Sequence, residues 1–81
     1  MSFTVRLDVA KLIRSARLAG LNSDYALAKK MGINRSTLSR VIDSELQPGP
    51  AFIGGALVAL DPLRFEDLFV VVPDQKSERT P

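Results

Sequence analysis

Cysteine and histidine are both absent from this sequence of 81 residues. Without cysteine the chain forms neither disulfides nor thiolate metal sites, and without histidine it lacks the usual general base and the commonest zinc ligand. The sequence also has no phosphate-cradling glycine motif and no cluster of metal-ligating side chains. These absences argue against an enzyme and predict neither a cofactor nor a metal ion.

Long apolar runs are missing as well. No run approaches the ~18 residues that indicate a membrane span, and residues 1–7 lack the basic and apolar stretches of a signal peptide. We therefore expect a cytoplasmic protein with no membrane contact. A chain of this length forms one small domain, and its core must come from the 46% of residues that are hydrophobic.

The formal net charge of +2 is unevenly distributed along the chain. Residues 1–40 hold eight basic and two acidic side chains, a net charge of +6, whereas residues 41–81 hold three basic and seven acidic ones, a net charge of −4. A basic half favours a polyanionic partner, because phosphate contacts dominate the affinity of proteins for nucleic acids. A solvated charged surface explains the same imbalance, so charge alone does not decide the function.

Hydrophobic spacing predicts a mainly α domain over residues 1–73, followed by a disordered polar tail at residues 74–81. Residues 3–7 alternate apolar and polar side chains, as a half-buried strand does. Helical spacing and turn signals predict five helices, at residues 9–19, 24–31, 35–43, 51–60 and 63–69. The β-branched run Val70, Val71 and Val72 predicts a second short strand.

Several residues suit particular places in these helices. Asp8, either Asn22 or Ser23, and Asn34 are good N-caps for the first three helices, and residues 32–34 form a turn between the second and third.

Other residues carry expectations about packing. Gly54 and Gly55 each cost about 1 kcal/mol inside a helix, so we expect a neighbouring backbone to pass close by. We expect Tyr25, near the start of the second helix, to be partly buried.

The third helix separates apolar from polar side chains. Steps of about 100° per residue place Leu38, Val41 and Ile42 on one side. The other side carries two guanidiniums, two hydroxyls and a carboxylate, from Arg35, Ser36, Ser39, Arg40 and Asp43. Arginine pairs with the O6 and N7 atoms of guanine, and an α-helix fits the major groove of DNA. This helix is therefore equipped to read a duplex.

These residues resemble the Cro/repressor helix-turn-helix family, of the xenobiotic-response-element type. The match runs from Leu27 to Val41, continues to Pro48, and ends in the segment from Phe65 to Phe69. The resemblance implies a five-helix lambda-repressor-like bundle, with a short β-ribbon where the terminal strands pair. It also implies contacts to base edges from Arg35, Ser36 and Arg40, with Asn34 as a further candidate, and to phosphates from Thr37 and Ser39. The start of the second helix should lie against another phosphate.

Two positions depart from the family pattern. The family commonly has glutamine where Asp24 stands, and a carboxylate there would repel a phosphate. Either Asp24 turns away to cap its own helix, or the docking differs locally. The family often has a glutamate, paired with an arginine of the first helix, where Ile42 stands. Apolar packing replaces that pair here, which is often neutral or stabilising.

The second strand needs a partner, because a single strand is not stable alone. One hypothesis pairs Val70, Val71 and Val72 with residues 3–7 of the same chain. The other pairs them across a two-fold axis in a homodimer, as phage Cro proteins do, and the two arrangements are compatible.

The leading functional prediction is a sequence-specific regulator of transcription that binds double-stranded DNA, acting as a dimeric repressor at an operator. An antitoxin with the same DNA-binding face is a close variant. The alternative from another class is an adaptor that uses the fold to bind proteins and not DNA.

Overall fold

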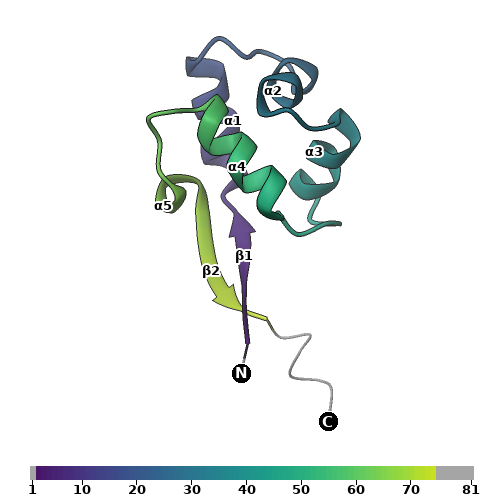
Figure 1. Ribbon diagram of the computed structural model, residues 1–81, viewed down its shortest axis with the longest axis vertical. Helices are drawn as coiled ribbons and strands as arrows, with labels where there is room; N and C mark the ends of the chain where they lie inside the picture. Colours follow the sequence, from purple (N-terminus) through teal and green to yellow (C-terminus); the bar gives the residue numbers. More distant parts are fainter. Residues whose placement is uncertain (1, 75–81) are drawn as a thin grey trace.

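Five helices and two strands make up the part of the chain that the computed structural model describes, residues 2–74. Figure 1 shows the helices gathered above a two-stranded ribbon. The elements follow one another as β1 (Phe3–Leu7), α1 (Val9–Leu18), α2 (Asp24–Met31), α3 (Arg35–Ile42), α4 (Pro50–Ala59), α5 (Phe65–Leu68) and β2 (Phe69–Pro73). The predicted mainly α architecture is confirmed. The predicted tail falls largely on residues 75–81, which lie outside the described residues.

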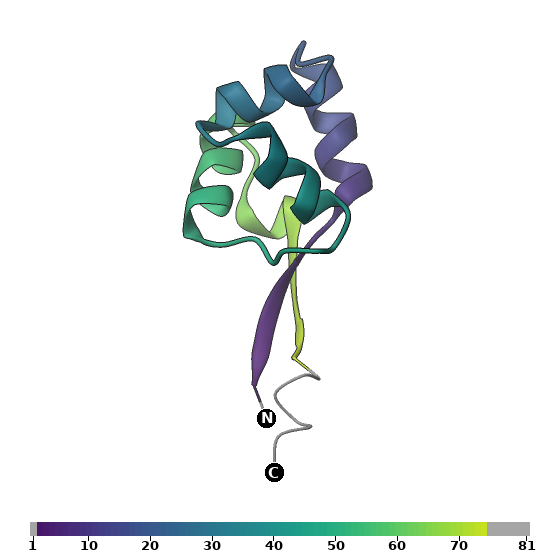
Figure 2. The same cartoon turned by 90° about the vertical axis from the view of Figure 1, so that its right-hand side faces the viewer.

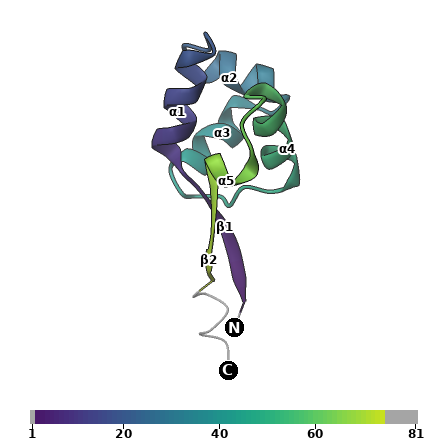
Figure 3. The same cartoon turned by 90° about the vertical axis from the view of Figure 1, so that its left-hand side faces the viewer.

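The ribbon joins the first and last elements of the described chain. β1 pairs with β2 in antiparallel register, from Leu7 opposite Phe69 to Phe3 opposite Pro73. This confirms the intrachain hypothesis for the terminal strands. The ribbon enters the bundle at Leu7 and Phe69, which are buried, and it projects away from the helices in all three views (Figures 1, 2 and 3).

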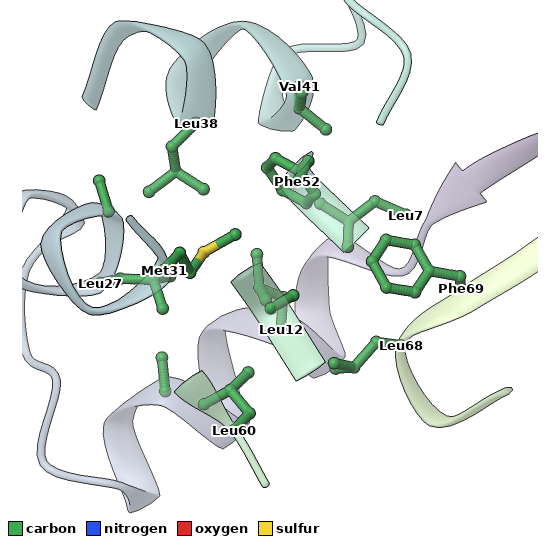
Figure 4. Close-up of a cluster of buried hydrophobic side chains, with 13 residues drawn as sticks. Leu7, Leu12, Leu27, Met31, Leu38, Val41, Phe52, Leu60, Leu68 and Phe69 are labelled. Carbon is green, nitrogen blue, oxygen red and sulfur yellow. The ribbon is translucent and has the colours of Figure 1, made fainter. Parts of the chain in front are cut away.

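The core is one cluster to which every helix and both strands contribute (Figure 4). The largest fully buried side chains are leucines from four different helices, namely Leu12, Leu27, Leu38 and Leu68. Phe69 packs edge-to-face on Phe52, with ring centroids 6.3 Å apart. Truncating a buried leucine to alanine costs about 2–5 kcal/mol of stability, so each of these helices is fixed to the others by a substantial contact.

Most of the N-caps predicted from the sequence are found at the helix ends. A carboxylate oxygen of Asp8 accepts a hydrogen bond from the Lys11 amide at 3.1 Å, and Ser23 Oγ accepts one from the Ala26 amide at 3.1 Å. Ser23, and not Asn22, is therefore the cap of α2. Asn34 occupies the N-cap position of α3, but its side chain makes no capping hydrogen bond. The predicted N-cap position is therefore confirmed, but the exposed side chain of Asn34 does not supply the capping bond.

The two glycines of α4 differ in their surroundings. A Cβ atom on Gly55 would collide with the carbonyl oxygen of Met31, so the backbone of α2 does pass close to this position. A Cβ on Gly54 would meet nothing within 4 Å, so the close approach of a neighbouring backbone is confined to Gly55. Helix α5 is also shorter than the expected residues 63–69, because Arg64 is its N-cap and Phe69 already belongs to β2.

Candidate nucleic-acid interface

Helices α2 and α3 are joined by the three residues Gly32, Ile33 and Asn34. Gly32 has a φ of 77°, in the left-handed region that glycine adopts readily. The amide of Ile33 then donates to the carbonyl oxygen of Ala28 at 3.0 Å, and the side chain of Ile33 packs on the core. These contacts fix the angle between the two helices and produce a helix-turn-helix.

Helix α3 is held to the bundle along one side. Leu38 and Val41 are buried, with relative exposures of 0% and 4%, and the half-buried Ile42 packs beside them. Figure 4 shows Leu38 and Val41 pointing from α3 into the core. Because three side chains of an eight-residue helix anchor it, the opposite side is presented on a rigid support.

The opposite side of α3 is open to solvent. We define the recognition surface as the four exposed polar residues of α3 together with its exposed N-cap residue, which are Arg35, Ser36, Ser39, Arg40 and Asn34. The C-cap residue Asp43 is also exposed, at the other end of the helix. The structure thus brings together five of the six predicted site residues in one exposed arc. Thr37, the sixth, is half-buried, at the margin between this surface and the core.

Both guanidiniums of the recognition surface are unengaged. Within residues 2–74, neither Arg35 nor Arg40 forms a hydrogen bond or an ion pair through its side chain. Asp43 and Glu45, which follow in sequence, form no ion pair with either guanidinium. A guanidinium without a protein partner keeps its five donors for an external acceptor.

The first turn of α3 lacks the acidic residue that helices favour there. An acid near a helix N-terminus is worth about 0.3–1 kcal/mol. Helices α2 and α5 carry one, whereas α1 and α4, like α3, carry none. Helix α3 instead begins with Arg35, which gains nothing from the helix dipole. The missing acid is therefore not peculiar to α3, but it leaves the first turn of this helix without negative charge, at the end that enters a groove in helix-turn-helix complexes.

The start of α2 differs from the sequence-based expectation in one respect. Tyr25 is 61% exposed, so the prediction of partial burial was wrong. Tyr25 lies outside the buried stripe of Leu27, Ala28 and Met31. Its position on the helix relative to that stripe could have predicted that it faces solvent. Asp24 is exposed beside it, and Ser23 supplies the capping bond in its place. A phenol and a carboxylate therefore flank the N-terminal end of α2.

A groove of about 650 Å³ separates the ribbon from the loop that follows α3. Thr4 on β1 bridges it by donating a hydrogen bond to Gln47 Oε1 at 2.9 Å. Among residues 2–74 no group of histidine, cysteine or carboxylate side chains could hold a metal ion, and no helix is long and apolar enough to span a membrane. The recognition surface is thus the strongest candidate site in the described chain.

Comparison with known proteins gives one similarity. No family model and no solved structure matches the chain. Over 52 residues the chain is 44% identical to a protein of Bacillus subtilis (strain 168) named as the uncharacterized HTH-type transcriptional regulator YvzC. The similar segment covers 60% of this chain, and the chain spans 66% of the length of that relative. Together with the helix-turn-helix geometry, this similarity supports a helix-turn-helix regulator family for the protein.

Proposed function

We propose that the protein is a transcriptional regulator of the Cro/repressor type, with a lambda-repressor-like fold, that binds double-stranded DNA through α3. The observation that carries this proposal is the recognition surface, which presents two unengaged arginines on a helix anchored from behind by Leu38 and Val41. The similarity to a protein named as a transcriptional regulator supports it.

In the proposed complex α3 lies in the major groove and reads base edges. Arg35 and Arg40 donate bidentate hydrogen bonds to guanine, and Ser36 and Asn34 reach neighbouring bases. Ser39 and Thr37 contact phosphates and fix the register of the helix on the duplex. The N-terminal end of α2 points its free N–H groups at another phosphate.

A single recognition helix reads only a few base pairs. A genome offers so many competing sites that such a short sequence does not define a unique one. We therefore infer that two copies occupy half-sites about 34 Å apart, one helical turn of DNA. Such a dimer represses transcription by occupying the operator and excluding the polymerase.

Selection of bound sequences from random duplexes, followed by electrophoretic mobility shift at several salt concentrations, tests the function. We expect an enriched sequence and an affinity that falls steeply as salt rises, because bound phosphates release counterions. Retained sequence preference at moderate salt separates a regulator from a merely basic surface. Absence of binding at low salt would overturn the proposal and favour an adaptor that binds proteins.

A further inference from the structure

The groove beside the ribbon has no part in the proposed contact with DNA. One wall of this groove is β1, from Thr4 to Leu7, and the other is the loop of residues 44–48 that follows α3. Figure 2 shows this loop passing the base of the ribbon, and the hydrogen bond between Thr4 and Gln47 ties it to the strand. The volume of about 650 Å³ lies within the roughly 300–1,000 Å³ of small-ligand sites.

The outer edge of β1 carries unpaired backbone groups. Successive residues of an antiparallel strand direct their N–H and C=O groups alternately toward the partner strand and away from it. The amide of Asp74 donates to the carbonyl oxygen of Ser2 at 3.0 Å. At the inner end of the ribbon the amide of Asp8 donates to the carbonyl oxygen of Leu68 at 2.8 Å, so the even-numbered residues of β1 face β2. Val5 therefore directs its N–H and C=O to the outer edge, where neither group has a hydrogen-bond partner within residues 2–74.

An open edge of this kind accepts a further strand. Proteins often block such an edge with proline, and Pro73 removes one donor from the outer edge of β2. The strand β1 contains no proline, and its residue Val5 lines the groove. The unpaired backbone groups and the groove therefore occupy the same place.

Opposite charges lie on the two walls of the groove. Arg6 belongs to β1 and Glu45 to the loop. Both side chains are exposed, and in the described part of the chain neither forms a hydrogen bond or an ion pair. A second carboxylate, that of Asp74, lines the end of the groove near the tip of the ribbon. The apolar part of the lining includes Val9 and Val41.

This lining selects the class of ligand. DNA is disfavoured, because its phosphates would meet the carboxylates of Glu45 and Asp74. A short peptide with free ends satisfies the whole lining. Its terminal carboxylate binds Arg6, its terminal ammonium binds Glu45, and its backbone pairs with Val5 as an added strand. The four lining residues of β1 span about 13 Å, at about 3.3 Å each, which is the length of three or four peptide residues.

We propose that this groove binds short apolar peptides with free ends, which add to the edge of β1 between Arg6 and Glu45. Their apolar side chains pack on the valines of the lining. The site lies apart from the recognition surface but adjoins α3, because Val41 of α3 lines it. Peptide binding does not depend on the proposed function and is measured without DNA.

Nuclear magnetic resonance of the full-length, nitrogen-15-labelled chain tests the location. The probe is the tripeptide Ala-Leu-Ala with both ends free. We expect the amide signals of Val5 and of loop residues 45–47 to shift during the titration, and that of Arg14, exposed on α1, to stay in place. Absence of shifts at about 10 mM peptide, about ten times a Kd of 1 mM, would overturn the proposal.

A probe methylated on the leucine nitrogen tests the strand pairing. This peptide lacks the N–H that donates to the carbonyl oxygen of Val5, so we expect it to bind about tenfold more weakly. Equal binding by the methylated peptide, or by leucine alone, would overturn addition to the edge. Shifts at Val5 on raising the protein concentration without peptide would show that another copy occupies the edge, which would also overturn the proposal.

Capped probes test the two charges. The wild-type chain should bind the C-terminal amide about tenfold more weakly than the free acid, because the amide lacks the charge that pairs with Arg6. Arg6→Gln should bind both forms equally, whereas Arg14→Gln should keep the preference. In the same way, Glu45→Gln should lose the preference for a free amino end over an acetylated one, and Glu66→Gln, at an exposed glutamate of α5, should keep it.

These ratios compare two peptides on one variant, so a change in stability does not alter them. A preference for the free acid that survives in Arg6→Gln would overturn the assigned carboxylate site. Failure of the chain to bind DNA, with the peptide ratios intact, would count against the proposed function and not against the groove.

Discussion

The carbonyl oxygen of Met31, at the end of α2, occupies the space into which a Cβ atom of Gly55 on α4 would project. This contact sets how closely α4 packs against the helix that precedes the turn. The neighbouring Gly54 has no such constraint, so the pair forms a matched test of packing against helix propensity.

We expect Gly55→Ala to destabilise the protein by about 1–3 kcal/mol, because the methyl group forces α2 and α4 apart. Gly54→Ala should stabilise it by up to about 1 kcal/mol, since alanine is the better helix former and its methyl group meets open space. Thermal unfolding measures both, with a shift of about 4–8 °C per kcal/mol for a domain of this size. Destabilisation by both variants to the same extent would show that the α2–α4 contact is not the cause.

Arg35→Ala and Arg40→Ala should each weaken binding to the selected sequence by about 1–3 kcal/mol and relax the preference at the base pair that each contacts. Both side chains are exposed and make no internal bonds, so the stability of the variants should not change. Arg14→Ala, at an exposed arginine of α1, removes the same charge elsewhere and serves as the control. If binding weakened equally for all DNA sequences, Arg35 and Arg40 would be shown to contact phosphates and not base edges.

Asp24→Asn should strengthen DNA binding to all sequences alike, because it removes a carboxylate from the end of α2 that faces a phosphate in the proposed complex. The capping bond comes from Ser23 and survives the change, so we expect a stability loss of only about 0.3–1 kcal/mol from the helix dipole. Ser23→Ala is the counterpart. It should lower stability by about 1 kcal/mol without that gain in affinity. Titrations of duplex DNA and unfolding curves separate the two effects, and unchanged affinity in Asp24→Asn would place α2 away from the DNA.

Ser44→Gly should stabilise the protein by about 1 kcal/mol. Ser44 has a φ of 62°, in the left-handed region, at the position after the C-cap of α3. Its amide donates to the carbonyl oxygen of Val41 at 3.1 Å, and the amide of Glu45 donates to that of Arg40 at 2.8 Å, which is the paired closure that glycine normally makes at a helix end. Denaturant unfolding measures the gain. Ser39→Gly, inside the helix, is the control and should lose stability.

Much of the fold was predictable because its signals are local. Helical spacing located α1, α2 and α3 to within a residue or two, and the alternation of residues 3–7 located β1. The exposed arc of α3 followed from the same spacing. Three-dimensional contacts were not predictable in this way. Two adjacent glycines gave identical signals, yet Gly55 meets a backbone and Gly54 meets solvent.

The sequence pattern also could not predict which residue at a helix end makes a capping hydrogen bond. Asn34 and Ser23 are both favourable caps, but only Ser23 makes the capping bond. Whether the terminal strands paired with each other depended on the path of the whole chain, because β1 and β2 lie at opposite ends of the sequence. The hydrophobic pattern specified each strand without specifying its partner.

The antiparallel register that sets Phe3 opposite Pro73 has a consequence for biosynthesis. β1 is synthesised before every described helix and β2 after all of them, so the ribbon closes only once the whole helical bundle has been made.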